Sequence, residues 1–213
     1  DFYYVDGTPV LALLHGLDVV AKARWGKAPD LVLSGPNEGQ NAGAIILSSG
    51  TVSAAQYAAV RVIPAIALSA GINTTGANLA NPLSREVARL SAQLVASIEA
   101  KAGKTGALLP QGLALNVNFP DKLDGAAWKA TRIGTYNAYT VTFSANLAAN
   151  PSPLMRAMAQ SQGGAVPANP GVALDFNTAP PSAAEADDES VVMKSAIAVS
   201  PMQAGYAWPE GAR

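Results

Sequence analysis

Cysteine is absent from this sequence, and histidine occurs only once among its 213 residues. The protein therefore forms no disulfide, has no thiolate metal site and uses no cysteine nucleophile. A metal site built from several histidines is excluded as well, and a Ser-His-Asp triad has His15 as its single candidate. Because His15 lies in an apolar stretch that predicts a helix, we interpret it as a packing or surface residue rather than a catalyst.

Charged residues are also scarce. They make up 14% of the chain, and the formal net charge is −1, whereas charged residues account for about 25% of a typical protein. Without a basic run, the chain is not expected to bind a nucleic acid polymer. No apolar stretch approaches the roughly 18 residues that a membrane span needs, so a membrane partner is not expected either.

The chain opens on Asp1 without an initiator methionine, and no signal-like segment precedes that residue. We interpret this start as a product of processing, or as a piece whose upstream part lies elsewhere. Together with the lack of cysteine, it favours the bacterial periplasm or secretion, with the cytoplasm as the alternative.

The first part of the chain alternates between strand and helix patterns. This alternation, at this spacing, indicates parallel α/β units around one core. The continuous apolar run at residues 31–33 is typical of a strand that is covered on both faces. The expected strands are residues 3–5, 31–33, 63–69 and 113–120, and the expected helices are residues 10–23, 51–62 and 81 to about 101.

From about residue 121 the pattern changes. Residues 128–133 and 139–143 alternate like exposed strands, and residues 149–181 are rich in Pro, Ala, Asn and Gly. The acidic stretch 182–190 is interpreted as a solvated loop, and residues 191–202 predict a final strand. We therefore divide the chain into part of an α/β core, residues 1–120, and a β-rich appendage or oligomerisation arm that returns to the core, residues 121–213.

The segment "LVLSGPNEGQNAGAIILSSGTV" carries the main functional signal. The chain lacks the G-x-G-x-x-G, G-x-x-x-x-G-K-[ST] and G-x-S-x-G motifs, so dinucleotide, P-loop and hydrolase-elbow sites have no support. What remains is a glycine-rich loop after a parallel strand, the place where open α/β sheets bind ligands. Gly35, Gly39 and Gly43 allow close approach of the backbone to a ligand.

Two kinds of ligand fit this segment. The amide oxygens of Asn37 and Asn41 are hard neutral donors that suit Mg²⁺, Mn²⁺ or Ca²⁺. Ser49, Gly50 and Thr51 stand where the next helix begins, and the free N–H groups of a helix start favour an anion.

Plainer interpretations of the same residues stay open. Ser49 or Thr51 is also a sufficient helix cap, and either asparagine is also an ordinary turn former. Thr8 with Pro9 is a sufficient helix start in its own right.

Longer motifs resemble the SurE family of metal-dependent nucleoside-monophosphate phosphatases. "PDLVLSGPNEGQNAG" is similar to the family pattern P-D-L-V-[VL]-S-G-x-N-x-G-x-N-x-G, and "LSSGTVSAAQ" is similar to [YH]-S-G-T-V-x-A-A. "VIPAIALS", "LALNVNFP", "YYVDGTPVLALLHGL" and "VVMKSAIAVSPMQ" resemble further family segments. The resemblance implies a Rossmann-like three-layer sandwich with a mostly parallel sheet and a C-terminal antiparallel β arm.

The resemblance also implies roles for individual residues. Asn37 would ligate a divalent metal, Mg²⁺, Mn²⁺ or Ca²⁺, and Ser49, Gly50 and Thr51 would hold the substrate phosphate. The remaining implied positions are the loop-shaping Gly35, Gly39, Asn41 and Gly43, and Gly7 and Thr8 at the pocket wall. The implied reaction is hydrolysis of a nucleoside 5′- or 3′-monophosphate or another phosphomonoester, as in a nucleotidase or acid phosphatase.

One departure from the family is large. The family's paired aspartates lie in an N-terminal "N-D-D-G" turn, which this chain lacks together with the βα units around it. One amide oxygen does not hold a catalytic Mg²⁺ alone, so a companion N-terminal fragment of the same protein is expected to supply the carboxylates. The competing hypotheses are a non-catalytic binder of phosphorylated ligands, and an inactive or purely structural α/β fragment. The family also implies a homodimer or tetramer in which the arm is exchanged.

Overall fold

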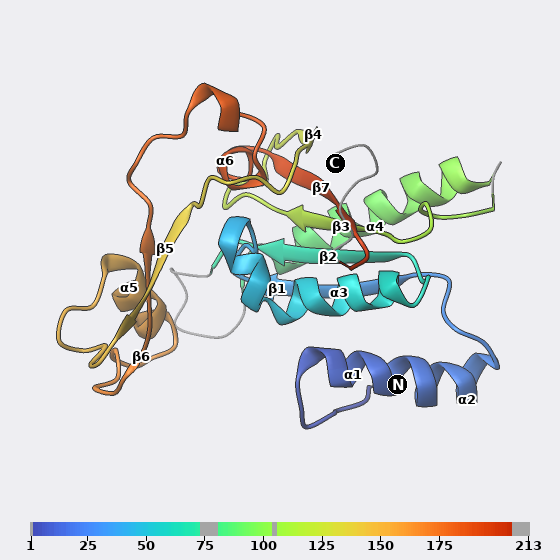
Figure 1. Cartoon of the computed structure of the whole chain (residues 1–213), viewed down its shortest axis with the longest axis horizontal. Helices are drawn as coiled ribbons and strands as arrows, with labels where there is room; N and C mark the ends of the chain where they lie inside the picture. Colours follow the sequence, from blue (N-terminus) through green and yellow to red (C-terminus); the bar gives the residue numbers. More distant parts are fainter. Residues whose placement is uncertain (1, 73–80, 104–105, 206–213) are drawn as a thin grey trace, which may run out of the picture.

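The computed structural model describes residues 2–72, 81–103 and 106–205, which form an α/β fold (Figure 1). Its main sheet has five strands in the order β1-β2-β3-β7-β4. The first three of these are parallel, β7 is antiparallel to β3, and β4 is parallel to β7. The predicted, mostly parallel sheet is thus confirmed. The strands are β1 (Val32–Glu38), β2 (Ala65–Ala70), β3 (Leu113–Asn118), β7 (Ile197–Gln203) and β4 (Trp128–Ala130).

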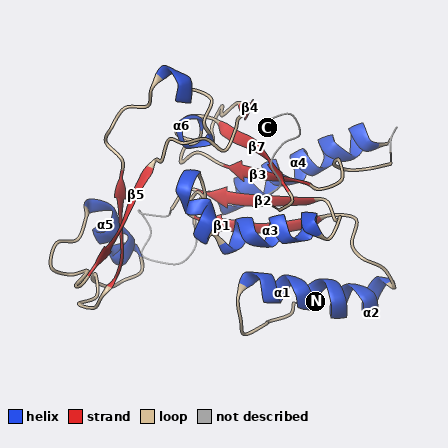
Figure 2. Cartoon of the chain, in the orientation of Figure 1, coloured by secondary structure: helices blue, strands red, loops and turns tan. Residues whose placement is uncertain are grey.

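Helices cover both faces of this sheet (Figure 2). Successive side chains of a strand point to opposite faces. On β2, Ala65 and Ala67 belong to the cluster that packs on α3 (Gly50–Val60). Ile66 and Leu68 belong to the cluster on the other face, which includes residues of α4 (Ser84–Ala102). The three-layer arrangement implied by the sequence is therefore present.

Small side chains bring α3 close to the sheet. Ala55 and Ala58 on the helix are fully buried, as are Ala65 and Ala67 on the facing strand. Because the alanine side chains are small, α3 can pack closely against the strands. This packing holds the start of α3 beside the end of β1. The helix predicted over residues 51–62 is confirmed with slightly different ends.

The N-terminal helix lies on the outer side of α3 (Figure 1). It begins as α1 (Pro9–His15), continues through a π-helical stretch (Gly16–Ala21) and ends as α2 (Lys22–Trp25). The strand predicted at residues 3–5 is wrong. Residues 2–5 lie in no strand, and no described strand pairs with them, so their aromatic and β-branched composition was not sufficient to form one.

A second, two-stranded sheet forms the arm. β5 (Tyr139–Ser144) pairs antiparallel with β6 (Gly171–Phe176), and α5 (Pro153–Ser161) packs beside them. Figure 1 shows the arm extending from the end of the molecule where β1 and β2 terminate. The antiparallel β arm is thus confirmed, whereas α5 and β6 lie inside the Pro- and Ala-rich stretch that predicted no element.

Two assignments in the C-terminal part need correction. The exposed strand expected near residue 128 is present as β4, but it completes the main sheet instead of joining the arm. The final strand begins later than expected, because α6 (Glu189–Val192) precedes it. The remaining short elements are the 3-10 helices η2 (Gly43–Ser48) and η3 (Ala183–Glu185). Among the described residues, no helix is both long and apolar enough to cross a membrane.

One residue of the fold has an unfavourable backbone conformation. Val62 follows the end of α3 with a φ of 62°, in the left-handed region. Glycine is the usual residue at this position after a helix, because a β-branched side chain is crowded there. The Val62 side chain is mostly exposed, so its packing offsets little of this strain.

We therefore expect Val62→Gly to raise the free energy of unfolding by about 1 kcal/mol. The control is Val60→Gly, since Val60 is also exposed but is the last residue of α3 and has no positive φ. That change should lower the stability, by up to about 1 kcal/mol. Urea unfolding of both variants measures the two effects, and a Val62→Gly variant less stable than wild type would contradict the strain argument.

Candidate functional site

The end of β1 is shaped by a close approach of backbones at Gly35. Gly35 has a φ of 113°, and a Cβ there would lie 2.2 Å from the carbonyl oxygen of Leu68. Any side chain would separate β1 from β2 at this point. The strand register shifts between Ser34 and Asn37, after which pairing with β2 resumes. The segment after residue 33, predicted as loop, is therefore still strand as far as Glu38, and Asn37 is held by that strand.

Asn37 is half-buried near the end of β1. Its Nδ2 donates to the carbonyl oxygens of Gly39, at 2.9 Å, and Glu38, at 3.3 Å. Among the described residues, Oδ1 has no hydrogen-bond partner. The side chain therefore forms part of a turn and at the same time leaves its amide oxygen available to a ligand, so the turn-former and metal-ligand interpretations are compatible.

The loop after Asn37 is held by hydrogen bonds from its own backbone. Asn41 is buried; its N–H donates to Asn118 Oδ1 at 2.8 Å, and its carbonyl accepts from Nδ2 of Asn116 and of Asn118. Its side-chain Nδ2 donates to Ser69 Oγ at 2.8 Å. These contacts place Asn41 in the interior, where it fixes the loop to β2 and β3.

Gly43 lies in an equally crowded place. Its φ is 59°, and a Cβ there would lie 2.5 Å from Asn137 Oδ1. The Gly43 N–H donates to Glu189 Oε1 at 3.3 Å, and the next amide, of Ala44, donates to Asn137 Oδ1 at 2.7 Å. Internal partners therefore take up these N–H groups, and they are not free to bind a ligand.

The acidic stretch 182–190 is only partly the solvated loop that the sequence predicted, because residues 182–187 are mostly exposed and its last three residues are buried. Asp188 and Glu189 are both fully buried. Arg132 lies 2.7 Å from Asp188 Oδ1, and the Tyr136 N–H donates to Asp188 Oδ2 at 2.9 Å. Gly134 leaves room for this carboxylate, because a Cβ there would overlap it. The end of the charge run, at Asp188, thus ties the start of α6 to the segment after β4.

Glu189 joins the glycine-rich loop to the sheet. Besides Gly43, it accepts a hydrogen bond from Asn116 Nδ2 at 3.0 Å. Burial raises the pKa of the Glu189 carboxyl to about 7, and hydrogen bonds from Ser200, Asn116 and Gly43 act in the opposite direction. Near neutral pH this buried carboxyl is therefore partly protonated.

The start of α3 offers free backbone donors. Ser49 caps the helix, with its Oγ accepting from the Val52 N–H at 3.1 Å. The N–H groups of Gly50 and Thr51 have no acceptor among the described residues, and both residues are half-buried. The helix-cap interpretation of Ser49 is correct, and it leaves the two following amides directed at the carboxyl edge of the sheet.

Gly50 also has a packing reason to be glycine. A Cβ there would lie 2.4 Å from Cγ of Pro9, so the first residues of α1 and α3 are in contact. Thr8 caps α1, with Oγ1 accepting from the Leu11 N–H at 3.4 Å, and both Gly7 and Thr8 are exposed. The structure thus brings Thr8 next to the start of α3. A side chain at position 50 would clash with Pro9, so glycine is needed there whether or not a ligand binds.

The donor set fits a divalent cation only in part. Asn37 provides one neutral oxygen, and no group of three or more His, Cys, Asp or Glu side chains suited to a metal occurs among the described residues. Mg²⁺ and Mn²⁺ sites usually include carboxylates that offset the charge of the ion. A metal at Asn37 would therefore need further ligands from outside the described part of this chain.

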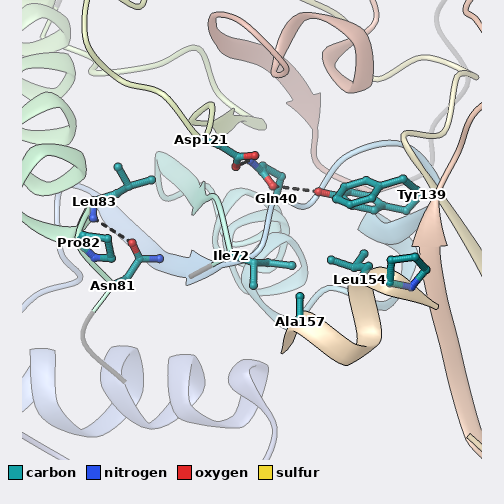
Figure 3. A pocket seen from close by; sticks show the side chains of 11 residues that line it. Gln40, Ile72, Asn81, Pro82, Leu83, Asp121, Tyr139, Leu154 and Ala157 are labelled. Atoms are coloured by element: carbon teal, nitrogen blue, oxygen red, sulfur yellow. Dashed lines mark hydrogen bonds between the residues drawn. The ribbon is translucent and has the colours of Figure 1, made fainter. Parts of the chain in front are cut away.

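Sequence reasoning missed a cavity between the arm and the core (Figure 3). Gln40, Asp121 and Tyr139 meet there, from segments that lie far apart in the sequence. No motif marks them, since their proximity depends on how the arm folds back over the ends of the strands.

Comparison with protein families matches residues 1–140 to the model described as "Survival protein SurE". A protein named 5′-nucleotidase SurE from Thermoanaerobacter sp. (strain X514) is 39% identical over 145 residues, which cover 68% of this chain and 51% of that protein. A protein of the same name from Sorangium cellulosum (strain So ce56) is 42% identical over 137 residues, covering 62% of this chain and 46% of that protein. The chain thus spans about half the length of the curated relatives it matches.

A solved structure agrees with these sequence matches. The crystal structure of SurE protein from Aquifex aeolicus is similar to this chain with a TM-score of 0.62 and 26% identity. The similarity covers 95% of this chain and 69% of that one.

The buried Glu189 generates a pH prediction. A carboxyl whose pKa is raised in the folded state binds its proton more tightly there, so the folded state is stabilised most below the unfolded pKa. Stability from this group should fall as pH rises from the usual 4.5 to about 7 and then level off. Glu189→Gln removes this titration. The wild type should therefore lose up to about 3 kcal/mol relative to the variant between pH 4.5 and 8.

Urea unfolding of both proteins across that pH range gives the measurement. Any change in hydrogen bonding caused by the amide adds a constant offset, so only the slope of the difference with pH matters. Glu99→Gln, at an exposed position on α4, is the control and should leave the slope unchanged. A pH-independent difference between wild type and Glu189→Gln would show that this carboxyl does not titrate as described.

Proposed function

This chain belongs to the SurE family, and from that premise we propose that it carries the phosphate-binding part of a metal-dependent phosphomonoesterase acting on nucleoside 5′- or 3′-monophosphates. The observation that carries the proposal is the pair of unpaired N–H groups at Gly50 and Thr51. They lie at the same edge of the sheet as Asn37, whose amide oxygen is open. That edge is where open α/β sheets bind ligands.

The phosphate is assigned to the start of α3. Backbone N–H groups and the positive end of the helix dipole favour an anion at this position. The hydroxyl groups of Ser49 and Thr51 add donors, because the Ser49 oxygen that accepts from Val52 keeps its own hydrogen to donate. Pro9 covers one side of Gly50 and limits access to the cradle from that side.

The metal is assigned to Asn37 Oδ1. When bound, a divalent cation would polarise the phosphoryl oxygens and orient a water nucleophile. The residues of this chain bind one side of the ion and hold the phosphate. Glu189 and Asn41 act at a distance from both, by fixing the loop between Asn37 and Ser49.

The remaining metal ligands are assigned to a companion segment that pairs with β1. β1 is the edge strand of the main sheet among the described residues, and Leu33 on it is 48% exposed. Strands of parallel sheets are usually covered, since their apolar faces and open edges otherwise contact water. A further strand beside β1 would place the carboxylates of its own carboxyl end next to Asn37.

A non-catalytic binder of phosphorylated ligands is the second candidate. The lack of an acidic cluster among the described residues favours it for the chain without a partner. The same helix start would then bind phosphate, and no hydrolysis would follow.

Phosphatase assays with p-nitrophenyl phosphate and nucleoside monophosphates test the enzyme proposal. We expect hydrolysis that EDTA abolishes and that Asn37→Ala lowers by about 100-fold or more, because a metal ligand is lost. The variant also loses the bond to Gly39, which should reduce stability by only about 1 kcal/mol. Asn150→Ala, an exposed asparagine in the arm, is the control and should keep full activity.

Three other outcomes of these assays would change the proposal. Activity that survives EDTA would remove the metal from the proposal. Phosphate binding without hydrolysis, in a sample whose intact mass reveals no companion segment, would favour the non-catalytic binder. Unfolding of Asn37→Ala would support a purely structural turn at this position.

A second copy of the chain is the proposed partner of the arm. Val141, Phe143 and Val172 lie on one face of the arm's sheet, and all three are exposed, Phe143 by 75%. Phe143 is directly opposite Val172 across the two strands. Exposed apolar clusters of this kind usually mark an interface, and we propose that this face packs on another copy in a homodimer or tetramer.

Phe143→Glu should dissociate that assembly, because a charge would be buried at its centre. Sedimentation or light scattering should report a dimer or tetramer for the wild type and a monomer for the variant. Thr142→Glu places the same charge on the opposite face of the same strand and should leave the oligomeric state unchanged. A monomeric wild type would exclude the proposed interface.

A further inference from the structure

The cavity between the arm and the core lies at the ends of the parallel strands. It has a volume of about 410 Å³ and is lined on the core side by Gln40, Ile72 and Asp121, and on the arm side by Tyr139, Leu154 and Phe176 (Figure 3). Small-molecule sites usually occupy roughly 300–1,000 Å³ and combine an apolar wall with a few fixed polar groups. This cavity has both features.

Its polar corner is held in place by hydrogen bonds. Gln40 Nε2 donates to Asp121 Oδ1 and to the carbonyl oxygen of Phe119, each at 3.0 Å. Its Oε1 accepts from the Tyr139 hydroxyl, also at 3.0 Å. Among the described residues, Asp121 Oδ2 has no hydrogen-bond partner. The corner therefore presents one fixed carboxylate oxygen that accepts from a ligand.

Its aromatic wall is formed by Tyr139 and Phe176. Their ring centroids are 5.6 Å apart with an interplanar angle of 31°. Burial raises the pKa of Tyr139 to about 12, so its hydroxyl stays neutral and keeps its bond to Gln40. Phe176 is 54% exposed, and it has a ring surface that a second planar group can cover.

The cavity adjoins the proposed metal ligand. A Cβ on Gly39 would lie 3.4 Å from Ile72 Cγ1 and 3.8 Å from Asn37 Nδ2, so the cavity wall and the Asn37 side chain flank the same glycine. The carboxylate of Asp121 disfavours a phosphate at the far end of the cavity. A phosphomonoester that reaches both regions must therefore place its phosphate beside Asn37 and its organic group in the cavity.

We propose that this cavity binds the nucleoside part of the substrate. The base stacks on the Tyr139–Phe176 wall, and an N–H or O–H of the nucleoside donates to Asp121 Oδ2. A wholly apolar group would cover the exposed Asp121 carboxylate without donating to its Oδ2, whereas a sugar alone would leave the aromatic wall uncovered. This assignment rests on the proposed nucleotidase function for its substrate class. It names Phe176 and Asp121 as the residues that select nucleotides over other phosphomonoesters.

The test uses adenosine, which has no phosphate and no need of a metal. Adenosine should bind the wild type in a calorimetric or NMR titration. Phe176→Ala should weaken that binding about tenfold, by analogy with the loss of one base-stacking aromatic. Asp121→Asn keeps the shape of the side chain and removes its charge, and it should weaken binding as well.

Two matched controls accompany these variants. Trp25→Ala removes an exposed aromatic on α2, and Asp124→Asn neutralises an exposed aspartate near Asp121 in the sequence; neither residue lines the cavity. Both should bind adenosine as the wild type does. In parallel, inorganic phosphate binding should be unchanged by Phe176→Ala, since phosphate is assigned to the start of α3.

The outcomes separate this inference from the proposed function. Adenosine binding that depends on Phe176 and Asp121 supports the cavity even if no hydrolysis is found. No adenosine binding, or binding that both variants leave unchanged, overturns the inference, whether or not the chain binds phosphate or hydrolyses p-nitrophenyl phosphate.

Discussion

The candidate site depends on one buried carboxyl group. The carboxylate of Glu189 accepts two hydrogen bonds. One comes from the backbone N–H of Gly43 in the glycine-rich loop, and the other from the side-chain Nδ2 of Asn116 on β3. A buried carboxyl is costly unless its partners are in place, so the loop, β3 and the start of α6 must adopt one mutual arrangement. The direction of Asn37 and the start of α3 follow from that arrangement, because Gly39, Asn41, Gly43 and Ala44 in the loop between them have their N–H groups bound internally.

Close backbone contacts set the rest of the geometry. Gly35 lets β1 approach β2, and Gly50 lets α1 approach α3. Glycine at these two positions reflects packing of protein on protein, whereas the open groups of the site are the N–H groups of Gly50 and Thr51 and the Oδ1 of Asn37. The glycine-rich segment therefore has two kinds of position, those that bring the elements together and those left open to a ligand.

The elements that could be predicted from the sequence are those whose signal lies within their own residues. The α3 helix, the apolar strands β2 and β3 and the exposed strand β5 each have a period or a cap within their own residues, and the SurE resemblance supplied the layer order. The segment around Asp188 was misjudged because burial of a charge depends on Arg132 and other partners far along the chain. The cavity was not predicted for the same reason, since Gln40 and Tyr139 meet only when the arm folds over the core. The metal-ligand role proposed for Asn37 rests on its motif, and the geometry adds only that its oxygen is open.

The position of β7 has a consequence for the order of assembly. It is the last strand among the described residues, yet it lies between β3 and β4 inside the main sheet. During synthesis, the edge of β3 stays unpaired until the whole arm and β7 have been made. Glu189, at the start of the α6 helix before β7, is made only shortly before this strand. Non-local pairing of this kind forms late. We therefore expect a ribosome-bound chain that stops before Glu189 to form the β1–β2 layer while the loop at Gly43 still lacks its buried carboxyl partner.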